Sequence, residues 1–260
     1  MDERLRCVGA GILRRLGVAA VLLALSLPPW VAAASGEADA MYEAGSIALG
    51  RRDYAAAIAA FERATAADPS DTRVLLKLGI ARAAIQDWTG ALEAYGALRK
   101  LEPRNARALN NTANVYFRQG KHAQAAGYYR QALEIDPDYL IAAYHYGWVL
   151  RQLNRPDEAE HQFSHCLELP AESQREQRTQ LDCRYYLGAL RYRAEDYETA
   201  ARVMEQVVSA MPSHPEARYY LAMAYRRLGR TEEARAQLEL HQKMLRAARS
   251  AKPIEKQRDP

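Results

Sequence analysis

Apolar residues recur along this chain at the spacing of amphipathic helices. Two neighbouring segments illustrate the spacing, one with Leu75, Leu78 and Gly79, the next with Ala91, Tyr95 and Leu98. Much of the apolar content is Ala, and runs of β-branched residues are few, which favours helices over strands. The pattern therefore predicts pairs of short helices. Such helices are marginal alone, so we expect them to be stabilised by stacking.

The pattern repeats with a fixed period. Pro69, Pro103 and Pro137 lie 34 residues apart, and each follows an acidic residue. A small residue, an Ala twelve positions later and a bulky apolar residue four positions after that recur in phase, in six units beginning near residues 38, 72, 106, 140, 181 and 215. One interval is seven residues longer, which predicts a longer loop or a helix extension near Ala171 to Gln180. A period of this size indicates a stacked array of small units.

The frame of small residue, Ala, aromatic residue and Pro resembles the tetratricopeptide-repeat (TPR) family over about residues 38–248. The resemblance implies an all-α fold, a right-handed α-solenoid of six helix pairs, with a concave groove lined by the first helix of each repeat. The implied repeats are 38–71, 72–105, 106–139, 140–173, 181–214 and 215–248. Pro is expected to end each pair, because it cannot continue a helix. The aromatic residue is expected to fill the gap between neighbouring repeats.

Both ends of the chain are expected to lie outside the solenoid. Residues 1–34 place arginines before an uncharged apolar run from Leu16 to Leu27, which Pro28 and Pro29 break, and end in small residues. This is the layout of a secretory signal peptide, with an uncleaved N-terminal anchor as the alternative. In either case the repeats are expected in the periplasm of a bacterium. Residues 249–260 are polar and are expected to be a disordered tail.

Charge and motifs exclude several classes of function. The net charge is only +4, and no sustained run of Lys and Arg is present, so no nucleic-acid partner is expected. Because the chain has no Gly-rich phosphate loop and no nucleophile elbow, neither catalysis nor a cofactor is expected. His161 and His165 are spaced for chelation but are two ligands short of a typical site, so no metal is expected.

The predicted function is a protein–protein interaction scaffold of the cell envelope. Asn is disfavoured in mid-helix but offers a donor and an acceptor to an extended backbone, and aromatic side chains add contact area. By the resemblance, the groove residues expected to contact a partner are Asn110, Asn111, Asn114, Phe117, Tyr144, His145, Trp148, Arg151, Tyr185, Tyr192, Tyr219 and Arg226. Some of the tyrosines could instead pack between repeats.

The expected partner is another envelope protein or a peptide segment of one. The alternative belongs to a different class: a polysaccharide or peptidoglycan strand, bound by a component of an envelope export or assembly system. Aromatic and Arg-rich grooves can also hold sugars.

Two cysteines follow the predicted signal segment. Cys166 falls late in the second helix of the fourth repeat, and Cys183 falls early in the first helix of the fifth. These helices are neighbours in a TPR stack, and an exported protein meets an oxidising environment. A Cys166–Cys183 disulfide is therefore expected, with two small buried thiols as the alternative.

Overall fold

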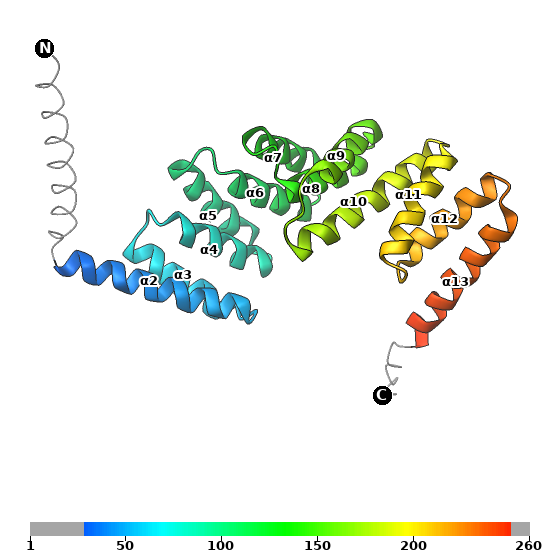
Figure 1. Ribbon diagram of the computed structural model, residues 1–260. Helices are drawn as coiled ribbons and strands as arrows, with labels where there is room; N and C mark the ends of the chain where they lie inside the picture. Colours follow the sequence, from blue (N-terminus) through cyan, green and yellow to red (C-terminus); the bar gives the residue numbers. More distant parts are fainter. Residues whose placement is uncertain (1–28, 251–260) are drawn as a thin grey trace, which may run out of the picture. The chain divides into compact units, whose positions relative to one another are not determined.

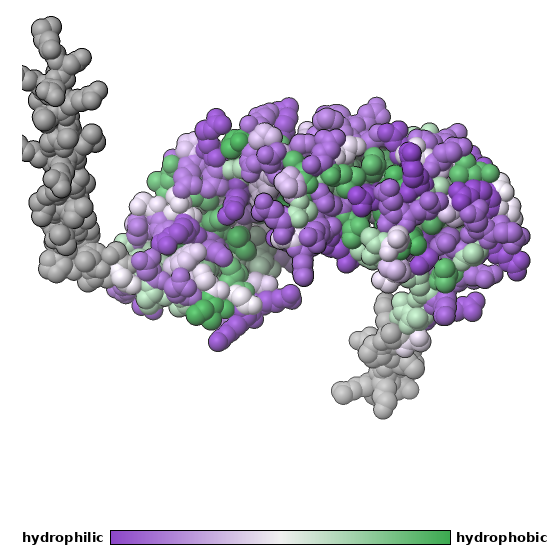
Figure 2. Space-filling view, in the orientation of Figure 1, coloured by the Kyte–Doolittle hydropathy of each residue, from purple (hydrophilic) through white to green (hydrophobic). Residues whose placement is uncertain are grey.

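The computed structural model describes residues 29–250, and in this range every element of regular secondary structure is a helix. The predicted all-α solenoid of helix pairs is confirmed (Figure 1). The helices belong to two compact units, divided after Pro103. Figure 2 shows hydrophilic residues over most of the face in view, with smaller patches of hydrophobic residues among them.

The described part of the first unit, residues 29–103, contains α2 (Pro29–Gly50), α3 (Tyr54–Ala67), α4 (Thr72–Ala84) and α5 (Trp88–Leu101). The second unit contains the remaining helices of the described range: α6 (Ala106–Arg118), α7 (His122–Ile135), α8 (Leu140–Gln152), α9 (Pro156–Glu168), α10 (Gln174–Arg193), α11 (Tyr197–Ala210), α12 (Pro215–Arg227) and α13 (Thr231–Ser250). Within each unit, helices that follow one another in the chain pack against each other.

The turn inside each helix pair has a recurring backbone conformation. A residue with positive φ occupies the same phase of every repeat: Arg52, Gln86, Gly120, Asn154, Glu195 and Gly229. This left-handed conformation reverses the chain and favours Gly, although the sequence supplies Gly at only two of these positions. The next residue caps the second helix in several repeats; Asp87, for example, accepts a hydrogen bond from Gly90 N at 3.0 Å.

Small residues allow close helix pairing, as the sequence pattern predicts. A Cβ atom added to Gly147 in α8 would lie 2.8 Å from Cε1 of Phe163 in α9, so no larger residue fits without movement of that ring. Phe163 also stacks on Tyr186 in α10, with ring centroids 5.3 Å apart. The bulky residue therefore fills the space within its own repeat as well as the gap to the next one.

The seven extra residues of the fifth repeat extend its first helix. Helix α10 begins at Gln174, and Ser173 and Glu176 cap its N-terminus reciprocally. Gln180 ties the extension to the preceding helix, because its Nε2 donates hydrogen bonds to the carbonyl oxygens of Cys166 and Leu169 at 3.2 and 2.6 Å.

Cys166 of α9 and Cys183 of α10 face each other beside this extension. Both side chains are fully buried. Their Cα atoms are 6.6 Å apart, within the range that the geometry of a disulfide allows. The helix extension places Cys183 in mid-helix, not near the helix start as the sequence pattern indicated.

At the N-terminal end, α2 begins at Pro29 and so includes the last residues of the predicted signal segment. The rest of that segment, and residues 251–260 of the predicted tail, lie outside the described residues. Helix α13 continues to Ser250, two residues beyond the predicted end of the last repeat. Within residues 29–250, none of the helices combines the length and the apolarity needed to cross a bilayer.

Candidate functional site: an aromatic face on the first helices of the second unit

The first helices of the four repeats in the second unit present a continuous set of aromatic side chains. We call the surface formed by α6, α8, α10 and α12 the first-helix face. Ring contacts connect each of these helices to the next: Phe117 with Trp148, Tyr144 with Tyr186, Tyr185 with Tyr220, and Tyr192 with Tyr220. The centroid separations run from 4.7 Å to 6.2 Å, within the range of favourable aromatic pairs.

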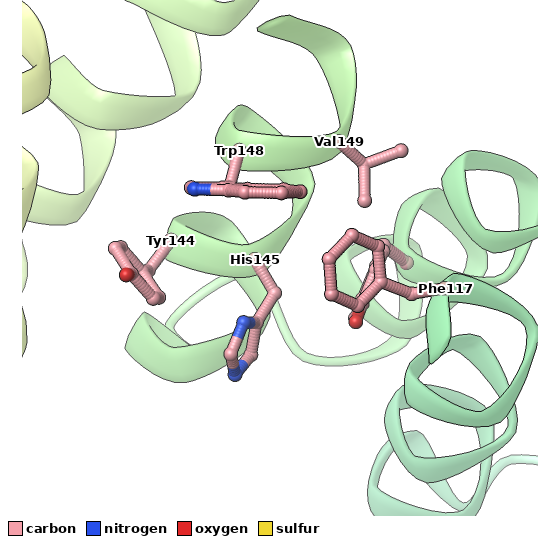
Figure 3. A pocket seen from close by; sticks show the side chains of 6 residues that line it. Phe117, Tyr144, His145, Trp148 and Val149 are labelled. Carbon is pink, nitrogen blue, oxygen red and sulfur yellow. The ribbon is translucent and has the colours of Figure 1, made fainter. Parts of the chain in front are cut away.

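A pocket of about 160 Å³ opens in this face between α6 and α8 (Figure 3). Its lining is mainly apolar and comes from three helices: Phe117 of α6, Tyr129 of α7, and Tyr144, His145, Trp148 and Val149 of α8. Figure 3 shows Phe117 and Trp148 on neighbouring helices with the pocket between their rings and the ring of His145. The volume is that of one apolar side chain of a ligand, not that of a whole cofactor.

Trp148 is held in place on three sides. Its ring meets Phe117 edge-on, at 4.7 Å and 87°. Its Nε1 donates a hydrogen bond to the Tyr186 hydroxyl at 3.1 Å. The Arg151 guanidinium lies 5.5 Å from the Trp148 ring and 4.7 Å from the Tyr186 ring. These contacts pre-organise a large, partly buried aromatic side chain, which is the type of residue that anchors binding interfaces.

The pocket carries no ionised lining group at neutral pH. Burial lowers the pKa of His145 to about 4, and the positive charge of Arg175 contributes in the same direction. Burial also raises the pKa of Tyr144 and of Tyr129 well above the usual value, so both phenols stay protonated. A neutral aromatic lining suits an uncharged apolar group.

The buried His145 makes folding stability depend on pH. Its folded-state pKa is depressed from 6.5 to about 4. Above pH 6.5 the imidazole is neutral in both the folded and the unfolded state, and this part of the stability is fully present. As the pH falls toward 4, the unfolded chain binds a proton that the folded chain does not, so stability is lost.

We expect His145 to account for a fall of about 2 kcal/mol in the free energy of unfolding between pH 6.5 and pH 4.5. Urea unfolding of the wild type and of His145→Gln at both pH values measures this contribution. His161→Gln, a substitution at an exposed residue of α9, is the matched control. An equal fall in the wild type and in His145→Gln would contradict the assignment.

The three asparagines of α6 occupy different environments. Asn114 Oδ1 accepts a hydrogen bond from the Tyr129 hydroxyl at 2.5 Å, so Asn114 orients a ring of the pocket wall. Asn111 is partly exposed and accepts a hydrogen bond from Asn110 Nδ2 at 3.3 Å. Asn110 departs from the expectation of a partner contact, because it is only 3% exposed. Helical spacing places Asn110 on the groove side, but surrounding side chains cover it; its Oδ1 has no hydrogen-bond partner among the described residues.

The remaining expected contact residues lie on the first-helix face at different depths. Tyr185 and Tyr192 are partly buried against Tyr220, whereas Tyr219 is 45% exposed and Arg226 is exposed. The expected set omits Tyr186 and Tyr220, which join neighbouring helices, and Tyr129 and Val149, which line the pocket. Tyr129 occupies the repeat position of a packing residue, and nothing in the repeat pattern indicates that its ring borders a pocket.

Residues 29–250 contain no cluster of three or more His, Cys, Asp and Glu side chains placed to hold a metal ion. The face offers ring surfaces, hydroxyl and amide groups, and guanidinium groups. This arrangement suits reversible binding of an extended ligand.

Comparisons with known proteins describe the same architecture. A family model described as tetratricopeptide repeat matches residues 31–72 and 76–139, and a second model with the same description matches residues 116–169 and 191–249. The Photosystem I assembly protein Ycf3 of Rippkaea orientalis is 33% identical over 41% of this chain and 72% of its own length. A probable N-acetylglucosaminyltransferase of Petunia hybrida, SPINDLY, is 31% identical but is matched over only 10% of its length.

Two solved structures are similar in fold. PilF of Pseudomonas aeruginosa has a TM-score of 0.68 against this chain, with 19% identity over 85% of this chain and 100% of that one. YrrB, described as a TPR protein with an unusual peptide-binding site, has a TM-score of 0.61 and 20% identity over 71% of this chain and 91% of that one.

Proposed function

Because this chain belongs to the tetratricopeptide-repeat family, we propose that it is a non-catalytic scaffold that binds a segment of another protein on the first-helix face. The aromatic pocket between α6 and α8 carries this proposal. It supplies one neutral apolar cavity, next to Trp148 and to hydroxyl and amide groups that can bond a peptide backbone.

The chemistry of the face favours a polypeptide ligand. An extended chain can place one apolar side chain in the pocket while its backbone follows the aromatic rings toward α10 and α12. The relative Ycf3 is named as a Photosystem I assembly protein, which supports the same class of function. The likeness to SPINDLY covers a tenth of that protein and gives no support for transferase activity here.

Export to the bacterial cell envelope is part of the proposal. It rests on the arginines and the apolar run of residues 1–34. Cell fractionation of the full chain and of a form that lacks residues 1–34 tests it. The full chain is expected in the periplasm or on the inner membrane, and the shortened form in the cytoplasm; the same compartment for both forms would refute export.

We also propose that Cys166 and Cys183 are oxidised in the exported protein. Their 17-residue separation corresponds to a stabilisation of about 3 kcal/mol on the chain-entropy model. Reduction should therefore lower the urea midpoint of the purified protein, and Cys166→Ser combined with Cys183→Ser should remove the effect of reductant. A titration that finds both thiols free in the unfolded, unreduced protein would end this proposal.

Co-purification tests the proposed function. The tagged full chain is compared with Trp148→Ala combined with Tyr144→Ala, and with a control that carries Trp88→Ala and Tyr54→Ala in the first unit. Circular dichroism first establishes that each form is folded. The parent and the control are expected to retain the same defined protein, and the pocket variant to lose it.

Retention of that protein by the pocket variant would contradict the assignment of the face. Saturable binding of peptidoglycan or polysaccharide fragments, abolished by the same two pocket substitutions and without any protein partner, would favour the glycan alternative.

A further inference from the structure

Arginines line one edge of the first-helix face. Each first helix of the second unit has arginine in its last turn: Arg118 in α6, Arg151 in α8, Arg191 and Arg193 in α10, and Arg226 and Arg227 in α12. Two of the same helices carry acidic residues closer to their N-termini: Asp182 in the middle of α10 and Glu216 in the first turn of α12. The positive charge is therefore concentrated at one edge, which we call the arginine edge.

Helix stability alone does not explain this distribution. Cations at a helix C-terminus interact favourably with the helix dipole, and this benefit applies equally to the second helix of each repeat. The last turns of α7 and α11 nevertheless contain no basic residue, and that of α9 contains only His165. Among the second helices of this unit, only the last one, α13, carries arginines near its C-terminus, Arg246 and Arg249. In the repeats before it, arginine follows the face and not helix ends in general. The first unit lacks this distinction, because α5 ends in Arg99 and Lys100.

Several arginines of this edge are available to a ligand. Arg118, Arg193 and Arg226 are exposed, and within the described part of the chain none of them forms an ion pair. Arg151 stacks on Trp148 and Tyr186, and Arg227 stacks on Tyr197 at 4.8 Å, and these contacts leave the guanidinium edges able to donate hydrogen bonds. Arg191 forms an ion pair with Glu160 and is therefore less available to a ligand.

The edge and the aromatic pocket are adjacent. Phe117 of the pocket wall precedes Arg118 directly in α6, and Arg151 lies over the ring of Trp148. A second hollow of about 270 Å³ lies beside them, lined by Arg151, Arg193, Asp157 and Glu160 among others. A ligand anchored in the pocket therefore meets arginines within a few residues of its anchor.

We propose that the bound segment is acidic: a stretch of polypeptide in which Asp or Glu residues lie within a few positions of one large apolar side chain. This inference rests on the proposed function and specifies its ligand. The apolar side chain occupies the neutral pocket, and the carboxylates pair with Arg118, Arg193 and Arg226 along the edge. Asp157 and Glu160 line the hollow that also contains Arg151 and Arg193, and these carboxylates disfavour the uniform phosphate charge of a nucleic acid.

Selection from a random twelve-residue peptide library on the purified full chain tests the inference. Three forms are compared: the parent, a triple variant of the edge (Arg118→Glu, Arg193→Glu, Arg226→Glu) and a triple variant with the same change of charge on second helices (Arg130→Glu, Arg202→Glu, Arg235→Glu). All six of these arginines are exposed. Affinities of enriched peptides are measured at two salt concentrations, with and without a single-stranded oligonucleotide competitor.

The parent and the second-helix variant are expected to enrich peptides with an excess of Asp and Glu around one large apolar residue. The edge variant is expected to bind those peptides at least tenfold more weakly, and added salt is expected to weaken their binding to the parent. Enriched peptides that are neutral or basic, or equal affinity for both triple variants, would overturn this inference and leave the proposed function standing. Displacement of every peptide by the oligonucleotide at lower concentration would overturn it in favour of nucleic acid. If no peptide is enriched on any form, the proposed function itself fails.

Discussion

Trp148→Ala is expected to weaken binding of the partner segment by about 30-fold or more, a loss of about 2 kcal/mol. The substitution removes the ring that forms one wall of the pocket together with its edge-on contact to Phe117 and its hydrogen bond to Tyr186. It also takes away the surface on which Arg151 rests. A partly buried tryptophan that is fixed by its neighbours can contact a ligand without losing much conformational freedom. Substitution of Trp148 should therefore weaken binding more than substitution of any peripheral residue of the face.

Titration calorimetry with the co-purified partner, or with an enriched peptide, measures the loss for Trp148. Trp148→Phe keeps a ring but not the indole N–H, and it should cause about half of the loss in binding free energy that Trp148→Ala causes. Trp88→Ala makes the same change at the start of α5 in the other unit and should alter affinity less than twofold. Equal losses for Trp148→Ala and Trp88→Ala would show that the effect does not arise in the pocket.

Ala125→Arg is expected to lower the free energy of unfolding of the second unit by about 4 kcal/mol or more. Ala125 lies in α7 with no exposed surface, in a core that also contains Ala113 of α6 and Leu150 of α8. An arginine there must either push the helices apart or leave its charge buried without a partner. Overpacking costs about 1–3 kcal/mol and an unpaired buried charge about 3–5 kcal/mol.

The same helix provides the control for Ala125. Ala123 is exposed two positions earlier, so Ala123→Arg adds the same side chain and charge to the surface of α7. Urea unfolding followed by circular dichroism should show a small change for Ala123→Arg and a large one for Ala125→Arg. Because repeats stabilise one another through their interfaces, Ala125→Arg is also expected to destabilise the neighbouring helices α6 and α8. Similar stability of the two variants would contradict the packing described for this core.

The sequence predicts most of the helix pairing because the same types of residue pack at the same positions in each repeat. Helices α4, α6, α8 and α12 begin at Thr72, Ala106, Leu140 and Pro215, the residues at which the periodic pattern places new repeats. The fifth repeat differs: its first helix begins at Gln174 and not at 181, because Ser173 and Glu176 cap the N-terminus of an extension of about two turns. The polar stretch before residue 181 was consistent with either a loop or a helix, and only the reciprocal capping distinguishes them.

The binding face is less fully predictable. Helical spacing identifies the residues that point toward the groove, and Phe117, Tyr144, His145 and Trp148 do line one pocket. It does not reveal which of them are covered by neighbouring side chains, as Asn110 is, or that the Tyr129 ring closes the pocket from the second helix. These features depend on how side chains from three helices fill space together, and no single repeat contains that information.

Site-specific photocrosslinking in cells tests the central claim most directly. A benzophenone amino acid replaces Tyr144 in the pocket, Tyr219 at the exposed part of the first-helix face, or His161 on α9 as the control position. Illumination is expected to join the protein to a polypeptide from positions 144 and 219 and not from 161, with the same segment of the partner identified by mass spectrometry at both face positions. Crosslinks of equal yield from position 161, or none from either face position, would contradict binding of a protein segment on the first-helix face.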